Sequence, residues 1–190
     1  MHKHLLTSRS TLFEKALSGN FKGSNEGIIS LKDHEPFIFA VYVDCLYTNS
    51  LALAPIMPDR DAGNGGITLC KVYVLAEKLQ DTDTKNLIMK CLVDGTGSGL
   101  AKEVAGRKFP YIPCSEAVKI IYGGTLPGSM ARKLLVDMYT CQARGRWIAS
   151  HQGWPMEFLT ELLADVLDKR IPPDDPLRER VSDKYMEKKK

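Results

Sequence analysis

Three alternating glycines are the residues in this chain whose spacing could most directly serve chemistry. Gly95, Gly97 and Gly99 alternate with other residues, and a glycine-rich turn of this kind can cradle a phosphate. In phosphate-binding loops, however, the glycines follow a strand, and a Gly-Lys-Ser/Thr sequence completes the best-known form. Here they follow an expected helix, and no such sequence comes after them. The pattern therefore favours a flexible linker.

Histidines, serines and carboxylates form no catalytic constellation in the sequence. Ser150 and His151 are neighbours, but a catalytic triad is defined by geometry and not by adjacency. Asp44 is the single charge in an apolar run, which favours a carboxylate at a rim or a cap. None of the four histidines has metal-ligand spacing with a cysteine or carboxylate: His2, His4, His34 and His151. We therefore predict no catalytic, cofactor-binding or metal-binding residue, no cofactor and no small-molecule substrate.

Charge and cysteine usage limit the class of partner and the compartment. The formal charge of +3 comes from 26 basic and 23 acidic residues, and the segment from Pro176 onward carries the whole excess. The rest of the chain carries equal numbers of basic and acidic residues. This balance argues against broad nucleic-acid binding, which needs a basic face. The five cysteines form no CxxC pair, so we expect small buried hydrophobes in a reducing compartment. No apolar stretch approaches 18 residues, so we expect no membrane contact and a cytoplasmic or nuclear location.

The first half of the chain is expected to hold four helical segments and one strand. Residues 2–19 form one or two short helices, with Ser10 as the cap of the second. Residues 27–31 form the one strand that the residue pattern indicates. Residues 35–48 form a helix with Pro36 in its first turn, and its apolar residues spread round most of its circumference, so it is predicted to be central and buried. After a loop over 55–66, two further helices meet at a cap formed by residues 81–83.

The second half is expected to be entirely helical. Residues 94–113 are predicted to be a loop, followed by helices over about 115–123, 129–143 and 155–169. Ser115 and Ser129 are the expected caps of the first two, and Pro155 opens the third. Trp147 and Trp154 are expected to anchor helices to one another, with a partner-binding patch as the alternative. The fold class is therefore mostly α with a small β remnant.

An ordered series of segments resembles a BTB/POZ domain over residues 2–94. The series comprises the His-Lys-His-Leu-Leu start, Ser8-Arg9-Ser10, Phe13 to Gly19, Phe21 to Ser24, Ile28 to Leu31, the run from Phe37 that ends in Leu46-Tyr47-Thr48, Lys71 to Leu79, and Leu87 to Leu92. No single motif is specific, but the order is. Ala117 to Tyr122, Thr125, Gly128 and Arg132 to Tyr139 are similar to the extension of many fungal BTB proteins.

The resemblance implies a domain division and a departure from the family pattern. We expect a BTB/POZ-like domain over 1–94, a linker over 95–113, a helical extension over 114–171 and a basic disordered tail over 172–190. Members of the family begin with a β-hairpin before the His-Lys segment, so this chain resembles an N-terminally truncated domain. Its strand at 27–31 would then lack its usual neighbour, and an unpaired edge invites association.

A protein-interaction scaffold is the function that the resemblance implies. It would self-associate or recruit a protein partner, and a ubiquitin-ligase substrate adaptor is a narrower form. Cullin binders of the family carry a glutamate where Gly23 stands, which puts cullin binding in doubt. The expected partner-binding residues are Leu5, Leu6, Phe13, Phe21, Lys22, Gly23, Ile28 and Ile29. The alternatives are a transcription-associated cofactor that uses the basic tail, and a small helical enzyme with Asp44, Asp137 or His151 in a cleft.

Overall fold

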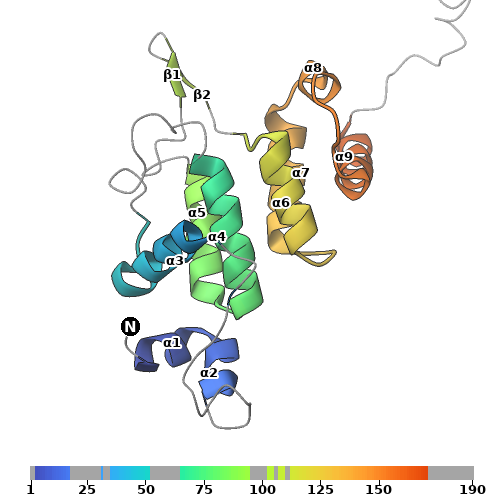
Figure 1. Cartoon of the computed structure of the whole chain (residues 1–190). Coiled ribbons are helices and arrows are strands. Elements are labelled where there is room, and N and C mark those ends of the chain that lie inside the picture. The colour runs from blue at the N-terminus through green and yellow to red at the C-terminus, as the bar shows by residue number, and fades with distance from the viewer. Residues whose placement is uncertain are drawn as a thin grey trace, which may run out of the picture.

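A computed structural model describes residues 3–17, 31, 35–51, 65–94, 102–104, 107–109 and 112–170. In the described part of the chain, helices predominate (Figure 1). The elements are α1 (Lys3–Arg9), α2 (Thr11–Leu17), α3 (Pro36–Thr48), α4 (Gly65–Leu79), α5 (Thr82–Asp94), β1 (Lys102–Val104), β2 (Arg107–Phe109), α6 (Ser115–Gly124), α7 (Met130–Gln142), α8 (Gly145–Ala149) and α9 (Met156–Lys169). The mostly α fold class is confirmed.

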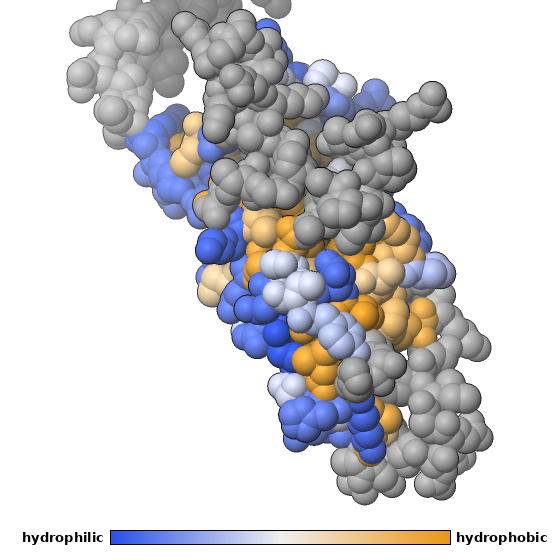
Figure 2. Space-filling model, turned by 90° about the vertical axis from the view of Figure 1, so that its left-hand side faces the viewer, coloured by the Kyte–Doolittle hydropathy of each residue, from blue (hydrophilic) through white to orange (hydrophobic). Residues whose placement is uncertain are grey.

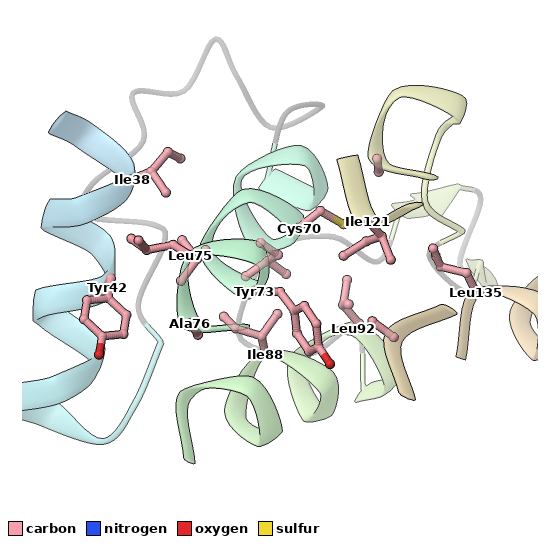
Figure 3. Packing of buried hydrophobic residues seen from close by; sticks show 14 of the residues in the cluster. Ile38, Tyr42, Cys70, Tyr73, Leu75, Ala76, Ile88, Leu92, Ile121 and Leu135 are labelled. Carbon is pink, nitrogen blue, oxygen red and sulfur yellow. The ribbon is translucent and has the colours of Figure 1, made fainter. Parts of the chain in front are cut away.

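Helix α4 lies at the centre of the molecule. It contacts α2, α3, α5 and α6, and residues on nearly all its sides are buried. Figure 3 shows Cys70, Leu75 and Ala76 of α4 between Ile38 of α3 and Ile121 of α6. An apolar helix needs neighbours all round it, because each exposed apolar side would lose the free energy of burial.

The predicted helix boundaries in the first half are confirmed to within a few residues. The segment 2–19 forms the two short helices α1 and α2, and Ser10 lies between them as the predicted cap. The Ser10 Oγ accepts a hydrogen bond from the Phe13 N–H at 3.1 Å, the N-cap arrangement. Asp81 does the same for α5, because its Oδ1 accepts from the Thr84 N–H at 3.0 Å.

Helix α3 is less buried than predicted. Ile38, Val41, Tyr42, Cys45 and Leu46 face the core, but Phe37 is 39% exposed and Tyr47 is 48% exposed. The expectation of a helix covered on all sides is therefore wrong, because in the described residues α3 packs against α1, α4 and α5 on one side only. The predicted strand at 27–31 lies outside the described residues apart from Leu31, which belongs to no helix or strand.

The predicted loop over 94–113 contains regular structure that sequence reasoning missed. Strands β1 and β2 pair antiparallel, with Lys102 opposite Phe109 and Val104 opposite Arg107. Three-residue strands are too short for the alternating apolar pattern that identifies a strand. Helix α8 was missed for the same reason, because five residues hold little more than one helical turn.

Two caps and several cysteines differ from expectation in the second half. Cys114, one residue before Ser115, is the N-cap of α6, whereas Ser129 caps α7 as predicted, though without a side-chain hydrogen bond. Cys45 and Cys70 are buried, but Cys91 is half-buried and Cys114 and Cys141 are exposed. Only two of the five cysteines are therefore the buried hydrophobes that their apolar contexts predicted.

Arg132 of α7 is a buried cation that joins three helices of the second half. It is 4% exposed, and its guanidinium stacks over the Tyr122 ring with the Arg132 Cζ 4.5 Å from the centroid. Its Nη2 donates to the Tyr122 carbonyl at 2.8 Å and its Nε to the Thr125 hydroxyl at 3.1 Å. Its Nη1 forms an ion pair with Glu157 of α9. The end of α6 and the starts of α7 and α9 are thus held by one side chain.

Removal of the Arg132 guanidinium should destabilise the second half. We expect Arg132→Met to cost about 3 kcal/mol of unfolding free energy, because buried carbonyls of α6 lose their donor and stay covered. Lys133→Met, at the adjacent exposed position, should change stability by less than about 0.5 kcal/mol. Urea denaturation of both variants measures the difference, and equal stabilities would contradict this role for Arg132.

The two helical halves share one hydrophobic core at the crossing of α4 and α6. Residues of both halves belong to a single buried cluster, and Val74 of α4 lies against Gly124 of α6. A Cβ placed on Gly124 would overlap the Val74 side chain. Gly124 therefore permits the close approach of the two helices, which no larger residue would allow without a shift.

The substitution Gly124→Ala tests this crossing. We expect it to destabilise the fold by about 1–3 kcal/mol, since the new methyl group overlaps Val74. Gly123→Ala is the matched control, because a Cβ there meets nothing within 4 Å, and the better helix propensity should stabilise by a few tenths of a kcal/mol up to about 1 kcal/mol. Val74→Ala should relieve the cost of Gly124→Ala in the double variant, measured by thermal and urea denaturation.

Candidate interaction surface

The short helices α1 and α2 are fixed to the core by polar and apolar contacts. The Ser10 Oγ donates to the Leu79 carbonyl at the end of α4 at 2.5 Å, and Ser10 is fully buried. Phe13, 3% exposed, and Leu6, 8% exposed, enter the hydrophobic cluster. Helices of seven residues are not stable alone, so these contacts decide where they lie.

A buried carboxylate joins α1, α3 and α5 beside this anchor. Asp81 is fully buried, and its Oδ2 accepts hydrogen bonds from the Thr84 hydroxyl at 2.7 Å and the Tyr42 hydroxyl at 3.1 Å. The Arg9 Nε lies 3.5 Å from Asp81 and 3.2 Å from Asp83. Burial, and then the neighbouring Asp81 charge, raise the pKa of Tyr42 far above its usual value. The cluster sets the position of α1 against the end of α3.

The outward side of α3 is the apolar part of the candidate surface. Phe37, Ala40 and Tyr47 are exposed, Phe39 and Val43 are partly buried, and the partly exposed Asp44 lies among the exposed residues. Figure 2 shows hydrophobic residues near the centre of the face on which α3 lies, with hydrophilic residues to their left and below. An apolar centre with a polar surround is typical of protein-interaction sites.

A polar hollow of about 540 Å³ lies at the C-terminal end of α3, between this end, the end of α1 and the outer face of α5. Asn49 ends α3 in the left-handed region, with φ of 49°, and its side-chain oxygen accepts from the Arg9 Nη1 at 3.4 Å. The residues that line the hollow are Arg9, Asn49, Asp83, Asn86, Leu87 and Lys90. We define the candidate interaction surface as this hollow together with Phe37, Ala40 and Tyr47.

The residues predicted to bind a partner are only partly placed. Leu6 and Phe13 are buried and Leu5 is half-buried, so in this chain their side chains face the core and position α1 and α2. Partner contacts of these three stay a prediction. The remaining five lie outside the described residues: Phe21, Lys22, Gly23, Ile28 and Ile29. Sequence reasoning missed the exposure of Phe37 and Tyr47, because it treated α3 as covered all round.

A second groove contains one residue that the enzymatic alternative required. It lies between α7 and α9 and has a volume of about 460 Å³. Asp137 lines it with three other carboxylates, Glu161, Asp165 and Asp168. Lys169 pairs with Asp137 at 2.8 Å and with Asp165 at 2.9 Å. Hydrogen bonding to Thr140 and Lys169 lowers the pKa of Asp165 below its usual value.

Metal and membrane sites can be addressed only for the described residues. Among them, no group of three or more histidine, cysteine or acidic side chains is arranged to hold a metal ion. The helices of the described ranges are also too short or too polar for any of them to span a bilayer.

Comparison with protein-family models finds a match in the first half of the chain. The family model of the BTB/POZ domain matches residues 1–93. No curated protein and no solved structure matches the chain. BTB/POZ domains mediate protein–protein interactions and oligomerisation, and this general role is what the match supports. The matched range covers α1 to α5 up to Val93, and therefore the whole candidate interaction surface.

The burial of Tyr42, together with the Asp81 charge and hydrogen bond, should make stability depend on pH in the alkaline range. A raised pKa in the folded state stabilises the fold below the unfolded tyrosine pKa of about 10, and this stabilisation is lost as the pH rises above it. Tyr42→Phe should cost about 1–2 kcal/mol at neutral pH. It should also weaken the decline in unfolding free energy above about pH 10, as urea denaturation at several pH values would measure.

Tyr73→Phe is the matched control for this experiment. Tyr73 is also buried, at 3% exposed, but it is not among the residues that hydrogen-bond to Asp81. The control should leave stability at neutral pH nearly unchanged. An unaltered pH dependence in Tyr42→Phe would show that this phenol is not held protonated in the folded state.

Proposed function

We propose that the chain is a protein–protein interaction scaffold or adaptor whose first half self-associates or recruits a protein partner through the candidate interaction surface. The BTB/POZ match over residues 1–93 supports the general role. The observation that carries the choice of surface is the outward side of α3, on which Phe37 is 39% and Tyr47 48% exposed.

The proposal extends to the type of BTB protein. We infer a BTB/POZ-like domain of the fungal type that continues into a helical extension, in the cytoplasm, the nucleus or both. The similarity of Thr125 and Arg132 to the fungal extension supports this, since Arg132 is the buried residue that organises α6, α7 and α9. A role as a substrate adaptor of a ubiquitin ligase is the narrower form, and Gly23 in place of a glutamate weighs against cullin binding.

Charge placed on α3 tests the proposed surface. Tyr47→Asp together with Phe37→Asp should weaken self-association or partner binding at least roughly tenfold, because a charge at the centre of an apolar contact must be desolvated without a partner. Light scattering after size exclusion measures self-association, and affinity capture followed by titration with the captured partner measures recruitment. The matched control is Leu126→Asp, which places the same charge at a 77% exposed leucine of the second half.

Circular dichroism and thermal melting must show that both variants stay folded, which the exposure of the substituted side chains favours. A wild-type chain that is monomeric at all concentrations and captures no protein would contradict the proposed function. If the α3 variant and the Leu126→Asp control self-associate or bind the partner equally well, the interaction role stands and only the choice of α3 as its surface is contradicted.

A further inference from the structure

The two tryptophans of the second half differ in their contacts. Trp154 is partly buried and stacks on Phe158, with the ring centroids 5.5 Å apart, and its indole N–H donates to the Ile148 carbonyl at 3.0 Å. Trp154 therefore anchors α8 to α9. Trp147 of α8 is 38% exposed, and within the described part of the chain its ring has no aromatic partner and its indole N–H no acceptor. An indole N–H usually finds a partner, so Trp147 has both an apolar ring and a donor to offer.

The charges beside Trp147 are basic and uncompensated. Arg144 and Arg146 are exposed, and neither guanidinium forms an ion pair with a carboxylate of the described residues. The sequence has no acidic residue between Asp137 and Glu157. The Trp147 N–H donates to the Arg144 carbonyl at 2.8 Å, so these two residues lie one turn apart. We call Arg144, Arg146 and Trp147 the α8 patch. Arginine and tryptophan are the residue types that contribute most to protein contacts.

The number of cations limits what the α8 patch can bind. Tight nucleic-acid binding uses about six to ten phosphate contacts, and attachment to an anionic membrane uses clusters of about four to eight basic residues. The patch has two arginines. A guanidinium instead matches a carboxylate through two parallel hydrogen bonds. The patch therefore fits a short acidic peptide segment that also has an apolar part for the indole ring.

The chain has a segment of this chemistry immediately after α9. Residues 171–177 read Ile-Pro-Pro-Asp-Asp-Pro-Leu and lie outside the described residues, and the basic part of the tail begins only at Arg178. Asp174 and Asp175 are two adjacent carboxylates for two guanidiniums. Proline-rich sequences favour the polyproline II conformation, which leaves its own carbonyls free to accept hydrogen bonds and binds to aromatic side chains.

We propose that residues 171–177 bind the α8 patch of the same chain. The Asp174 and Asp175 carboxylates pair with the guanidiniums of Arg144 and Arg146, the prolines lie on the Trp147 ring, and a carbonyl of the segment accepts from the indole N–H. The contact lies outside the candidate interaction surface, so the proposed function stands or falls separately from it.

The positions of α7, α8 and α9 allow this contact within one chain. The Lys169 Nζ lies 2.8 Å from the Asp137 Oδ1, so the last turn of α9 is beside the second half of α7. Helix α7 ends at Gln142, and α8 begins three residues later. The five residues that follow Arg170, up to Asp175, span about 17 Å when extended. A segment tethered so close has an effective concentration in roughly the millimolar range, which favours the patch of its own chain.

Nuclear magnetic resonance of the full chain tests the contact through the two indole N–H signals, which Trp147→Phe assigns. Asp174→Asn with Asp175→Asn should move the Trp147 signal and speed its hydrogen exchange with water at least roughly twofold, a modest factor because exposed ion pairs are individually weak. The Trp154 signal is the internal control, since its N–H is bonded to the Ile148 carbonyl, and it should not change.

Glu179→Gln with Asp183→Asn is the matched control variant. It removes the same charge from the tail, but beyond the proposed segment, and should leave the Trp147 signal unchanged. A Trp147 signal that is identical in the wild type and in the variant of Asp174 and Asp175 overturns the proposal.

Charge exchange tests the pairing itself. Arg144→Asp with Arg146→Asp should move the Trp147 signal, and the further changes Asp174→Arg and Asp175→Arg should restore it, because the exchanged charges attract again. If the reversed patch unfolds, as circular dichroism would show, Arg144→Gln with Arg146→Gln replaces it, and the Trp147 signal should move in the same direction. Exchanged charges that leave the signal displaced in a folded chain contradict the pairing.

Dilution and added ligands distinguish the other occupants. On about twentyfold dilution the wild-type Trp147 signal should stay in place, because a contact within one chain does not depend on concentration. A signal that moves on dilution assigns the patch to a second copy and overturns the proposal. A signal that ignores the tail variants but moves when single-stranded DNA or anionic vesicles are added also overturns it.

Discussion

The burial of α4 is the constraint on which the rest of the structure depends. Ten of its fifteen residues are buried, so the helix is stable only when neighbours cover it on nearly all sides. Helices α2, α3 and α5 cover it from the first half of the chain, and α6 covers it from the second. The two halves therefore form one hydrophobic core, and the extension stabilises the helices that carry the BTB/POZ match.

The polar groups in this core decide how its outer helices are placed. Hydrophobic burial has little directional preference, so it cannot by itself fix a seven-residue helix in one orientation. Ser10 and Asp81 supply the direction in the first half, since each satisfies backbone groups and binds a second element. Arg132 does the same in the second half. The candidate interaction surface depends on the polar contacts of the first half, because Arg9, which pairs with Asp81, lines its polar hollow together with Asn49.

Much of the fold was predictable because helix positions depend on local residue patterns. Ser10, Pro36, Ser129 and Pro155 stand at helix starts as predicted, since caps and first-turn prolines act within one turn of the chain. The hairpin over 102–109 and helix α8 were missed, because elements of three to five residues carry too little periodic pattern. The candidate site was less predictable. Leu6 and Phe13, chosen by resemblance, lie in the core, while Phe37 and Tyr47 are exposed.

The sequence by itself determined which segments are helical, which residues are apolar and, through the order of its segments, the resemblance to a BTB/POZ domain. Only the tertiary structure decided which apolar sides are covered. Periodicity identifies an apolar side of a helix, but burial depends on a neighbour that is distant in sequence. For that reason α3 and α9, both rich in apolar residues, each keep an uncovered side. The burial of Arg132 likewise depends on the tertiary structure, because folding brings the Tyr122 and Thr125 carbonyls and the Glu157 carboxylate to its guanidinium.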